Sequence, residues 1–497
     1  MRRLSLGLLR SLTPDDPTRS AREELSRRQA LAGLAATMAA GCASGAGSET
    51  GGDTAAGPGT IDHIIVVMME NRSFDHFLGA MKLVEGREID GLDASMSNTG
   101  SDGTVYAPFH AETQCVYDPP HGWNASHSQF NDGANDGFVT EYEADRAPAP
   151  AEVMSYMTRE DLPVTWALAD HYAVCDRWFC SVMGPTWPNR FYGHAGTSDG
   201  QKDNSWPEDG SFDFPTVWTK LEEIGVPWKY YYTDLPFIGL FEGHMRADTS
   251  AFLEDFVEDC ARGRLPPVCW VDPGFSYNDD HPPHYVGLGQ EFLSVVYHAL
   301  ATSPLWERCL LLITYDEHGG FFDHVPPPTT EDDHVDLGFD QMGFRIPVVV
   351  VGPWVKPGVC NTTFDNTSWL KLVCERFGIE PWTARIAAAT SLAEVLDAER
   401  MAAGQPYAPA EVPVVDVDDE AVPDECLGGG LGPTAPPASG SRRRGTPVHV
   451  QNQEELQAFI RAHMPEHDHT DTVPARMARL RGWLRERQRG ARGATGG

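Results

Sequence analysis

The chain has 497 residues, of which 41% are apolar and 13 are tryptophan, so it can form one large α/β domain or two to three ordinary ones. The formal net charge of −34 argues against nucleic acid as a partner, because a phosphate backbone is bound by Lys and Arg. Such acidity favours solubility. It does not exclude an anionic substrate, because a bound cation or a few local Arg can reverse the field inside a pocket.

The first 60 residues indicate an export signal followed by a tether. Residues 26–31 (SRRQAL) form a twin-arginine pattern, which directs export of folded proteins. A weakly apolar run at 30–40, too short to span a bilayer, ends at Gly41-Cys42. This end resembles a lipoprotein cleavage site with Cys42 as the lipidated residue, although Ala39 stands where a larger aliphatic residue is usual. Residues 43–60, rich in Gly, Ser, Ala and Thr, predict a flexible tether.

We therefore expect the twin-arginine export machinery as a partner. The protein would then be periplasmic, a cell-surface lipoprotein or extracellular. The alternative is an N-terminus with a chance Arg-Arg pair. The ten cysteines include no C-x-x-C pair, which argues against a thiolate zinc site. Without Cys42 nine remain, so at least one is unpaired in a monomer, and the sequence leaves their pairing open.

Two apolar runs predict central strands that end in acidic or amide residues. Residues 61–69 (IDHIIVVMM) are followed by Glu70 and Asn71, and residues 310–315 (LLLITY) by Asp316 and Glu317. Nearly continuous apolar runs of this kind are typical of parallel strands covered on both faces. In open α/β sheets, ligands bind beyond the carboxyl ends of the strands. We therefore expect these four side chains to meet at one edge of the sheet.

The remaining pattern predicts an α/β fold with a mostly parallel central sheet and helices on both faces. Further strands are expected at 267–271 and 346–351. Apolar spacing predicts helices at 163–173, 216–223, 290–302 and 367–377. Residues 90–150 and 199–285, rich in Gly, Pro, Asp and aromatics, predict long loop insertions over the carboxyl ends of the strands. Alternating strands and helices favour this fold over an all-β one.

The C-terminal part of the chain changes in composition. We expect a catalytic domain at 61–404, a Pro/Gly/Ala/Ser-rich flexible linker at 405–452 and a basic helical tail at 453–497. In the tail, Met477, Leu480 and Leu484 share one side of a helix. That helix either touches anionic lipid or is a peripheral helix with a solvated face. The histidines His463, His467 and His469 suggest a metal site, but a polar surface explains them as well.

The segment GPTWPNR at 184–190 supplies the candidate nucleophile, Thr186. A threonine hydroxyl is a poor nucleophile unless a metal bound to its oxygen lowers its pKa. Oxygen ligands for one divalent metal ion are available from Glu70, Asn71, Asp316 and Glu317 together with Thr186, and the ion itself stays open. Such a site suits hydrolysis of phosphate esters.

Other polar residues near these motifs are candidates for substrate contact. Asn189 and Arg190 follow Thr186 at the expected start of a helix, where an anion is favoured and Arg190 could pair with phosphate oxygens. His281 (in DDHPP) and His121 (in DPPHGW) could supply the proton for the leaving group. Each motif also has a structural interpretation: Glu70-Asn71 as a helix cap, Asp316-Glu317 as exposed turn acids, and the histidines as loop residues bonded to neighbours.

The combination resembles the bacterial phosphoesterase family, which holds secreted phospholipases C and related acid phosphatases. IIVVMMENRSFDHFLG, GPTWPNR, DDHPP, TYDEHGGFFDHVPPP and FRIPVVVVGPWVKPG occur in the family's order over roughly residues 61–400. The resemblance implies an alkaline-phosphatase-like core. It implies a covalent nucleophile and metal ligand at Thr186, and the other ligands at Glu70, Asn71, Asp316 and Glu317. It also implies phosphate contacts at His281 and His121.

The sequence departs from the family pattern at His318, which stands where Asn or a small residue is common, and in its C-terminal tail. His324 is either a neighbour of the site or a fold contact. The tail does not resemble the C-terminal β-domains of phosphocholine-specific members, which leaves phosphatidylcholine open as a substrate. We expect an exported phospholipase C, with acid phosphatase action on monoesters as the alternative. A third hypothesis is a non-catalytic lipid- or surface-binding lipoprotein. Such a protein would lack some of the metal ligands, whereas all five ligand positions are filled here.

Overall fold

The computed structural model describes residues 59–145, 147, 149–205, 212–423, 426 and 472–494. Several regions considered above lie outside the described residues. These are the export signal with Cys42, nearly all of the tether, residues 427–452 of the linker, and the tail up to residue 471 with His463, His467 and His469.

A central sheet of eight strands organises the described chain. In spatial order it contains β13 (Gly358–Cys360), β6 (Ala173–Cys175), β12 (Val349–Val351), β11 (Cys309–Tyr315), β1 (His63–Met69), β10 (Val268–Val271), β8 (Trp228–Tyr232) and β9 (Ser250–Phe252). Only β12 runs antiparallel to its two neighbours. The other pairs are parallel. The predicted fold class, a mostly parallel α/β sheet, is confirmed.

The two central strands, β1 and β11, place their carboxyl ends side by side. They pair in parallel from His63↔Cys309 to Met69↔Tyr315. β11 is buried throughout, and so is β1 after His63. Both therefore read as unbroken apolar runs, as a sheet covered on both faces requires. Because the register is in step, the residues after the two strands emerge at the same point of the sheet edge.

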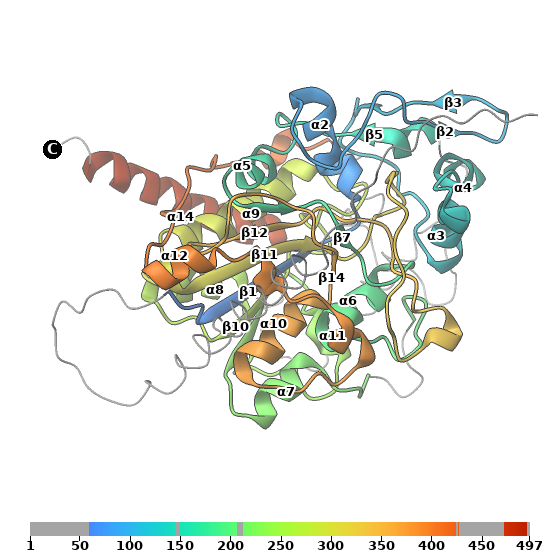
Figure 1. The fold of residues 1–497 in the computed structure, drawn as a ribbon. Helices are drawn as coiled ribbons and strands as arrows, with labels where there is room; N and C mark the ends of the chain where they lie inside the picture. Colours follow the sequence, from blue (N-terminus) through green and yellow to red (C-terminus); the bar gives the residue numbers. More distant parts are fainter. Residues whose placement is uncertain are drawn as a thin grey trace, which may run out of the picture. The chain divides into compact units, whose positions relative to one another are not determined.

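Helices cover both faces of this sheet (Figure 1). On one face, α6 (Thr186–Ala195), α7 (Val217–Glu223) and α10 (Ser368–Phe377) pack against β10, because His194, Trp218 and Trp369 all contact Trp270. On the other, α9 (Val286–Ala301) contacts α5 (Pro163–His171) and α8 (Leu253–Arg262). Five further helices are short: α2 (Ala80–Glu85), α3 (Trp123–Phe130), α4 (Phe138–Ala144), α11 (Ala384–Ala388) and α12 (Ala398–Ala403).

The four predicted helices are all present, with ends that shift by a few residues. Thr216 caps α7 with its hydroxyl, and Thr367 stands at the N-terminus of α10. The largest difference is at α9, which begins at Val286 rather than at residue 290. Its first turn contains Gly287 and Gly289, whose low helix propensity hides the true start. Burial of Val286, Leu288 and Gly289 in this turn overrides that propensity.

The regions expected as loops contain more regular structure than the sequence indicates. Residues 199–285 also supply β8, β9 and α8, which extend the sheet beyond β10. Residues 90–156 contribute short strands: β2 (Asn98–Thr99) pairs with β3 (Val105–Tyr106), and β4 (Phe109–His110) with β5 (Ser155–Tyr156). A further pair joins β7 (Trp178–Phe179) and β14 (Phe364–Asp365). Strands of two to five residues are too short for a clear periodicity.

The chain after residue 404 is attached to the catalytic unit. Carbonyls of Ala410 and Pro413 accept hydrogen bonds from Tyr297 and Ser294 of α9. A disulfide joins Cys426 to Cys115, 311 residues away in sequence. The described part of the expected flexible linker therefore packs on the domain that precedes it.

The basic tail helix, α14 (Val473–Ala494), packs on α9. Met477, Leu480 and Leu484 are buried, as the apolar spacing predicts. Arg476 and Arg479 pair with Glu254, and Arg481 with Glu291. These ion pairs support the interpretation as a peripheral helix, and lipid contact stays a prediction. Among the described helices, none has the length and apolar character needed to cross a membrane.

Candidate active site

The structure brings the five predicted metal ligands together. Glu70 and Asn71 follow β1, Asp316 and Glu317 follow β11, and Thr186 is the first residue of α6. The Thr186 hydroxyl lies 3.4 Å from Glu70 Oε2 and 3.3 Å from Asn71 Oδ1. All five side chains are buried, with at most 2% of any residue exposed. Three carboxylates, one amide and one hydroxyl thus converge from segments far apart in the sequence.

Backbone hydrogen bonds fix the two acidic loops against each other. Asp316 Oδ1 accepts the N–H groups of Asn71 (2.8 Å) and Glu317 (2.7 Å). Asn71 has φ of +60°, a left-handed conformation that Asn tolerates better than most residues. Gly319, with φ of +64°, lies so close that a Cβ there would be 2.0 Å from the Asn71 carbonyl oxygen. A glycine is therefore required for the approach of the two loops.

The loop that carries Thr186 is held by Asn189. The Asn189 amide donates to the carbonyls of Val182 and Gly184, each at 3.0 Å, and its Oδ1 accepts the Val182 N–H at 2.8 Å. Asn189 is fully buried. These bonds fix the turn that places the threonine hydroxyl at the start of α6.

Arg190 is the counter-ion of Glu70 within the protein. Its Nε donates to Glu70 Oε1 at 2.7 Å, its Nη1 to Asp272 Oδ1 at 3.0 Å and its Nη2 to the Met68 carbonyl at 3.1 Å. Both Asn189 and Arg190 were expected to contact substrate. The structure gives them partners within the protein, and a contact of either with substrate stays a prediction.

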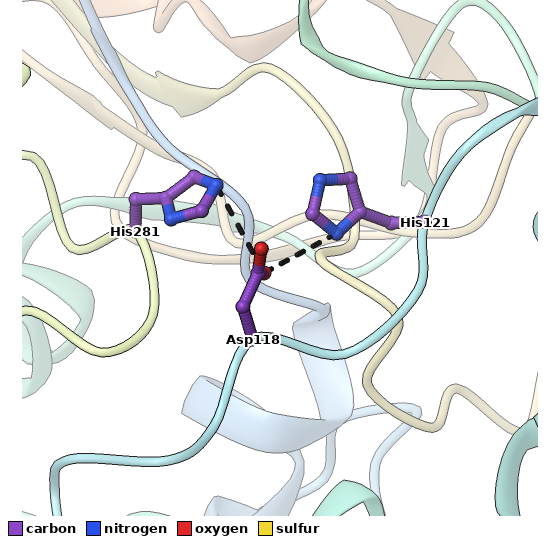
Figure 2. Close-up of side chains that lie close together, drawn as sticks. All are labelled: Asp118, His121 and His281. Carbon is purple, nitrogen blue, oxygen red and sulfur yellow. Dashed lines mark ion pairs between the residues drawn. The ribbon is translucent and has the colours of Figure 1, made fainter. Parts of the chain in front are cut away.

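His121 and His281 lie on either side of Asp118 (Figure 2). Asp118 Oδ1 is 3.6 Å from His121 Nδ1 and 4.0 Å from His281 Nε2. His121 Nε2 is 3.4 Å from the Asn71 amide nitrogen and 3.7 Å from Glu317 Oε1. His121 therefore reaches the ligand cluster, and His281, from a loop 160 residues further along the chain, lies beside His121 and Asp118.

His318 also contacts the ligand cluster. It lies 3.1 Å from Glu317 Oε2 through Nδ1 and 2.8 Å from Gln129 Oε1 through Nε2. Burial lowers its pKa well below the usual value, which favours the neutral ring. The departure from the family pattern thus falls on a neighbour of a ligand.

His324 belongs to a different cluster. Its Nδ1 bonds to Asp75 Oδ2 at 2.6 Å and its Nε2 to Asp90 Oδ1 at 3.2 Å. Arg345 pairs with Asp75 at 3.0 Å and with Asp323 at 2.9 Å. Of the two alternatives for His324, the structure selects the fold contact. We call Asp75, Asp323, His324 and Arg345 the outer cluster.

The electrostatics of the ligand cluster favour a bound cation. Burial raises the pKa of Glu70 and of Glu317 well above the usual range, with repulsion from Asp316 as the next cause. Burial raises the pKa of Asp316 to about 6, against the opposing effect of Arg190. These shifts reflect the cost of placing three carboxylates together in a buried site. A divalent cation removes that cost.

The donor set also fits a metal chemically. Asp316 Oδ2 and Glu317 Oε1 are buried and accept no hydrogen bond from any described residue. Buried carboxylate oxygens without a donor are rare in folded proteins. Hard oxygen donors of this kind suit ions such as Mg²⁺, Ca²⁺ or Mn²⁺. The prediction of a metal site with oxygen ligands is supported at this level, and the identity of the ion stays open.

Comparison with known families decides the assignment. The model of the phosphoesterase family matches residues 61–380, which hold the sheet and every candidate site residue. The chain belongs to the phosphoesterase family. The family prediction is therefore confirmed, and this is a family of hydrolases acting on phosphoric ester bonds.

Curated relatives of this phosphoesterase include plant and bacterial enzymes. Non-specific phospholipase C1 of Arabidopsis thaliana is 38% identical over 332 residues, which cover 60% of this chain and 62% of that protein. The match thus spans less than two thirds of the plant enzyme. Phospholipase C B of Mycobacterium tuberculosis is 32% identical over 428 residues, covering 71% of this chain and 82% of that protein.

Solved structures similar to this phosphoesterase include a protein in the alkaline phosphatase superfamily from Vibrio parahaemolyticus. It has a TM-score of 0.34 and 10% identity, and the match covers 72% of this chain and 77% of that one. Phosphonate monoester hydrolase of Agrobacterium radiobacter has a TM-score of 0.33 and 10% identity, covering 68% of this chain and 77% of that one.

Two residues of the phosphoesterase site were not predicted. Asp272 follows β10 and pairs with Arg190, Tyr230 and Trp270. The rule that directed attention to Glu70 and Asp316, a polar residue directly after a buried strand, would have found it. Asp118 stands three residues before His121, and its sequence carries no such signal. Only the fold shows that it separates two histidines.

Proposed function

We propose that this phosphoesterase is a metal-dependent phospholipase C that hydrolyses a phosphodiester through a phospho-threonine intermediate. One observation carries the proposal. The hydroxyl of Thr186 lies within 3.4 Å of oxygens from both Glu70 and Asn71, at the N-terminus of a helix and inside a buried cluster of carboxylates.

In the first step, Thr186 Oγ1 forms a bond to phosphorus and the bond between phosphorus and the diacylglycerol oxygen breaks. The threonine proton passes to a neighbouring carboxylate, of which Glu70 Oε2 is 3.4 Å away. The leaving oxygen takes a proton from His121, which faces Glu317, or from His281 beside it. Water then attacks phosphorus and gives a proton to that histidine, the bond to Thr186 Oγ1 breaks, the threonine oxygen takes its proton back from the carboxylate, and the phosphorylated head group is released.

The protein's own residues orient this reaction. Asn189 fixes the turn before Thr186, and Arg190 holds Glu70 in place. Glu70, Asn71, Thr186, Asp316 and Glu317 would hold the divalent cation. When bound, the cation supplies charge stabilisation for the phosphoryl oxygens and lowers the pKa of the threonine hydroxyl.

The choice of a phosphodiester rests on the relatives, which are named phospholipases C from a plant and from a mycobacterium. We take a glycerophospholipid as the substrate class. Acid phosphatase action on monoesters is the competing outcome of the test below.

The test separates the two products. Full-length protein is incubated with phosphatidylcholine and phosphatidylethanolamine vesicles and, separately, with p-nitrophenyl phosphate. We expect diacylglycerol from the vesicles, lost on addition of chelator and in the Thr186→Ala variant. Release of inorganic phosphate from the monoester alone would replace this proposal by a phosphatase. Turnover of neither substrate class would favour a non-catalytic lipid-binding protein.

We also propose that the enzyme is exported by the twin-arginine route. The SRRQAL pattern supports export, and the Cys115–Cys426 disulfide is in keeping with an oxidising compartment. Lipidation at Cys42 and the basic tail would each provide membrane contact. Replacing Arg27 and Arg28 by Lys should leave the protein in the cytoplasm, and unchanged export of that variant would contradict the route.

A further inference from the structure

Two free cysteines, Cys175 and Cys360, lie opposite each other on neighbouring strands at the edge of the sheet. Cys175 ends β6 and Cys360 ends β13, the edge strand, and the two residues pair directly in parallel register. We propose that these two thiols form a second disulfide under oxidising conditions, which joins the edge strand to the sheet. This inference goes beyond the proposed function, because it concerns thiol chemistry and requires no turnover.

The spacing of the two strands suits a disulfide. Neighbouring strands lie about 4.8 Å apart. The Cα atoms of bonded cysteines usually lie about 4.4–6.8 Å apart. Residues opposite each other in parallel register direct their side chains to the same face of the sheet, and the thiols of Cys175 and Cys360 are hydrogen-bonded to each other. A bond between the sulfurs therefore requires little movement of either strand.

Backbone and side-chain hydrogen bonds hold the two strands in register around the cysteines. The Asp176 N–H donates to the Cys360 carbonyl at 3.2 Å, and the Gly358 N–H donates to the Tyr172 carbonyl at 3.1 Å. The Asn361 amide donates to both carboxylate oxygens of Asp176, each at 2.8 Å. The residues before and after the cysteine pair are thus tied together, so the two thiols stay in contact.

A second pair of strand cysteines, Cys269 and Cys309, shows what the register excludes. Cys269 of β10 lies opposite Ile65, and Cys309 of β11 lies opposite His63, so the whole of β1 separates them. Two strand spacings amount to about 9.6 Å, which exceeds the usual range for a disulfide. Burial raises the pKa of Cys309 to about 12 and that of Cys269 well above the usual value. These two cysteines are therefore core thiols.

Cys360 is the thiol that reacts first. It is half-buried, whereas Cys175 is fully buried. The hydrogen bond with Cys175, helped by bonds with Thr362, lowers the pKa of Cys360 to about 6 against the opposing effects of burial and of Asp176. The same hydrogen bond and burial raise the pKa of Cys175. An accessible thiolate is the attacking group in thiol–disulfide exchange.

The oxidant is an external disulfide, such as oxidised glutathione or the disulfide of a thiol oxidoreductase. The Cys360 thiolate forms a bond to one sulfur of that disulfide, whose S–S bond breaks and releases a thiolate. The released thiolate takes the proton of Cys175. Cys175 then attacks the Cys360 sulfur, the mixed disulfide breaks, and the second released thiolate takes up the proton that Cys360 had lost. Two protein thiols are oxidised to one disulfide, and the external disulfide is reduced to two thiols.

The disulfide would stabilise a weakly held part of the fold. β13 has only three residues, and none of them is fully buried. A bond from Cys360 to Cys175 closes a long loop that contains Thr186 and the strands β7 to β12. Cross-links that close long loops restrict the unfolded chain most. The oxidised protein should therefore melt at a higher temperature than a protein that lacks this bond.

Disulfide mapping tests the proposal on the full-length chain. Protein is incubated with oxidised glutathione, its remaining thiols are blocked with N-ethylmaleimide in denaturant, and its peptides are identified by mass spectrometry without reduction. We expect the peptide with Cys175 joined to the peptide with Cys360. In Cys360→Ser, Cys175 should instead carry the blocking group. Cys374, a buried cysteine of α10, provides the matched control, and Cys374→Ala should keep the link.

Blocking groups on both cysteines of the wild type would overturn the proposal, and so would Cys360 joined only to glutathione or to another cysteine. The wild-type map needs no variant, so it decides the proposal even if Cys360→Ser does not fold. No activity or export is read, so failure of the phospholipase proposal would leave this result unaffected.

Thermal unfolding gives a second measurement. The difference in melting temperature between wild type and Cys360→Ser should be larger in oxidising than in reducing buffer, because only the oxidised wild type contains the second disulfide. The Cys115–Cys426 disulfide is common to both proteins and cancels in this comparison. An equal difference in the two buffers would contradict a bond between Cys175 and Cys360.

Discussion

The segments ENRSFDH (70–76) and DEHGGFFDH (316–324) together form two clusters of buried acids. The two clusters differ in the source of the positive charge that balances them. The inner cluster contains Glu70, Asp316 and Glu317. The outer cluster contains Asp75 and Asp323, and there Arg345 contacts both acids and lies 3.3 Å from His324. In the inner cluster Arg190 contacts Glu70, whereas Asp316 Oδ1 and Glu317 Oε2 are held by backbone N–H groups.

The difference shows how to separate a structural acid from a ligand. In the outer cluster the guanidinium of Arg345 already balances the acids, so no metal is needed there. Asp75, Asp323 and His324 are nevertheless close enough to bind one. Oxygens without donors do not separate the clusters, because Asp316 Oδ2, Glu317 Oε1 and Asp323 Oδ2 all lack one in the described chain. The clusters differ in their ion pairs: one guanidinium pairs with both acids of the outer cluster, whereas the arginine of the inner cluster pairs with Glu70. Removing a cation should therefore affect the inner cluster alone, and removing an arginine should affect chiefly the outer one.

The largest effect should follow from removing the nucleophile of the inner cluster. Thr186→Ala should lower kcat by about 10⁴-fold or more, because the attacking atom is lost while the rest of the site stays in place. The melting temperature should change little, because little buried volume is lost. Thr329, an exposed threonine, is the matched control, and Thr329→Ala should keep full activity. Near-wild-type turnover by Thr186→Ala would show that another group attacks phosphorus.

Breaking the outer cluster should instead destabilise the fold. Arg345→Met leaves the buried carboxylates of Asp75 and Asp323 without their partner, which should cost about 3–5 kcal/mol of unfolding free energy. Chemical denaturation measures the loss. Exposed Arg262 provides the control, because its ion pair with Glu258 is on the surface and Arg262→Met should change stability little. An unaltered denaturation midpoint for Arg345→Met would contradict the proposed difference between the clusters.

Adding metal should stabilise the protein through the inner cluster. An ion present at 100 times its dissociation constant adds about 2.7 kcal/mol to the unfolding free energy. Thermal melts of chelated protein with and without Mn²⁺ measure this shift. Asp316→Asn should abolish most of it, whereas Asp323→Asn should retain it. Equal responses of both variants would mean that the two clusters do not differ in the way described.

A third buried acid, Glu291, also has an arginine partner, and a smaller effect is expected when that arginine is removed. It lies on α9, 3.4 Å from Arg481 of α14, and burial raises its pKa to about 7 despite that arginine. Because the folded-state pKa lies above the usual 4.5, ionising Glu291 destabilises the fold as the pH rises from 4.5 to 7. Arg481 offsets this cost only when Glu291 is charged.

Arg481→Ala should therefore cost about 2 kcal/mol at pH 8 and less at pH 5, where Glu291 is protonated. Thermal unfolding at the two pH values gives the comparison. In the Glu291→Gln background the pH dependence of the Arg481→Ala effect should shrink, with the remainder due to Asp419, which also pairs with Arg481. A larger loss at pH 5 than at pH 8 would contradict the assignment.

The sequence predicted the inner cluster because each of its acids directly follows a recognisable strand. Glu70 and Asp316 come directly after long apolar strands, and parallel strands end at the same edge, so their meeting follows from pattern alone. Thr186 was found through its motif and the need for a nucleophile. The four helices followed from apolar spacing, and the structure confirms them.

The remainder depended on contacts between distant segments. Nothing near Arg345 in the sequence indicates that it reaches Asp75, 270 residues away. Asp118 and His281 meet only because separate loops are packed over the sheet edge. For Asn189 and Arg190, the sequence suggested an anion contact at a helix start, whereas the structure gives them partners on the preceding turn and on Glu70. The short strands β8 and β9 lacked a period long enough to recognise.

The most direct test of the account is a crystal structure of Mn²⁺-soaked protein with anomalous scattering measured for manganese. We predict an anomalous peak within about 2.4 Å of ligand oxygens from Glu70, Asn71, Thr186, Asp316 and Glu317. No peak should appear between Asp75 and Asp323, where Arg345 lies. Manganese at the outer cluster, or a Thr186 hydroxyl far from every bound ion, would contradict the central claim that the inner cluster, and not the outer one, binds the catalytic metal.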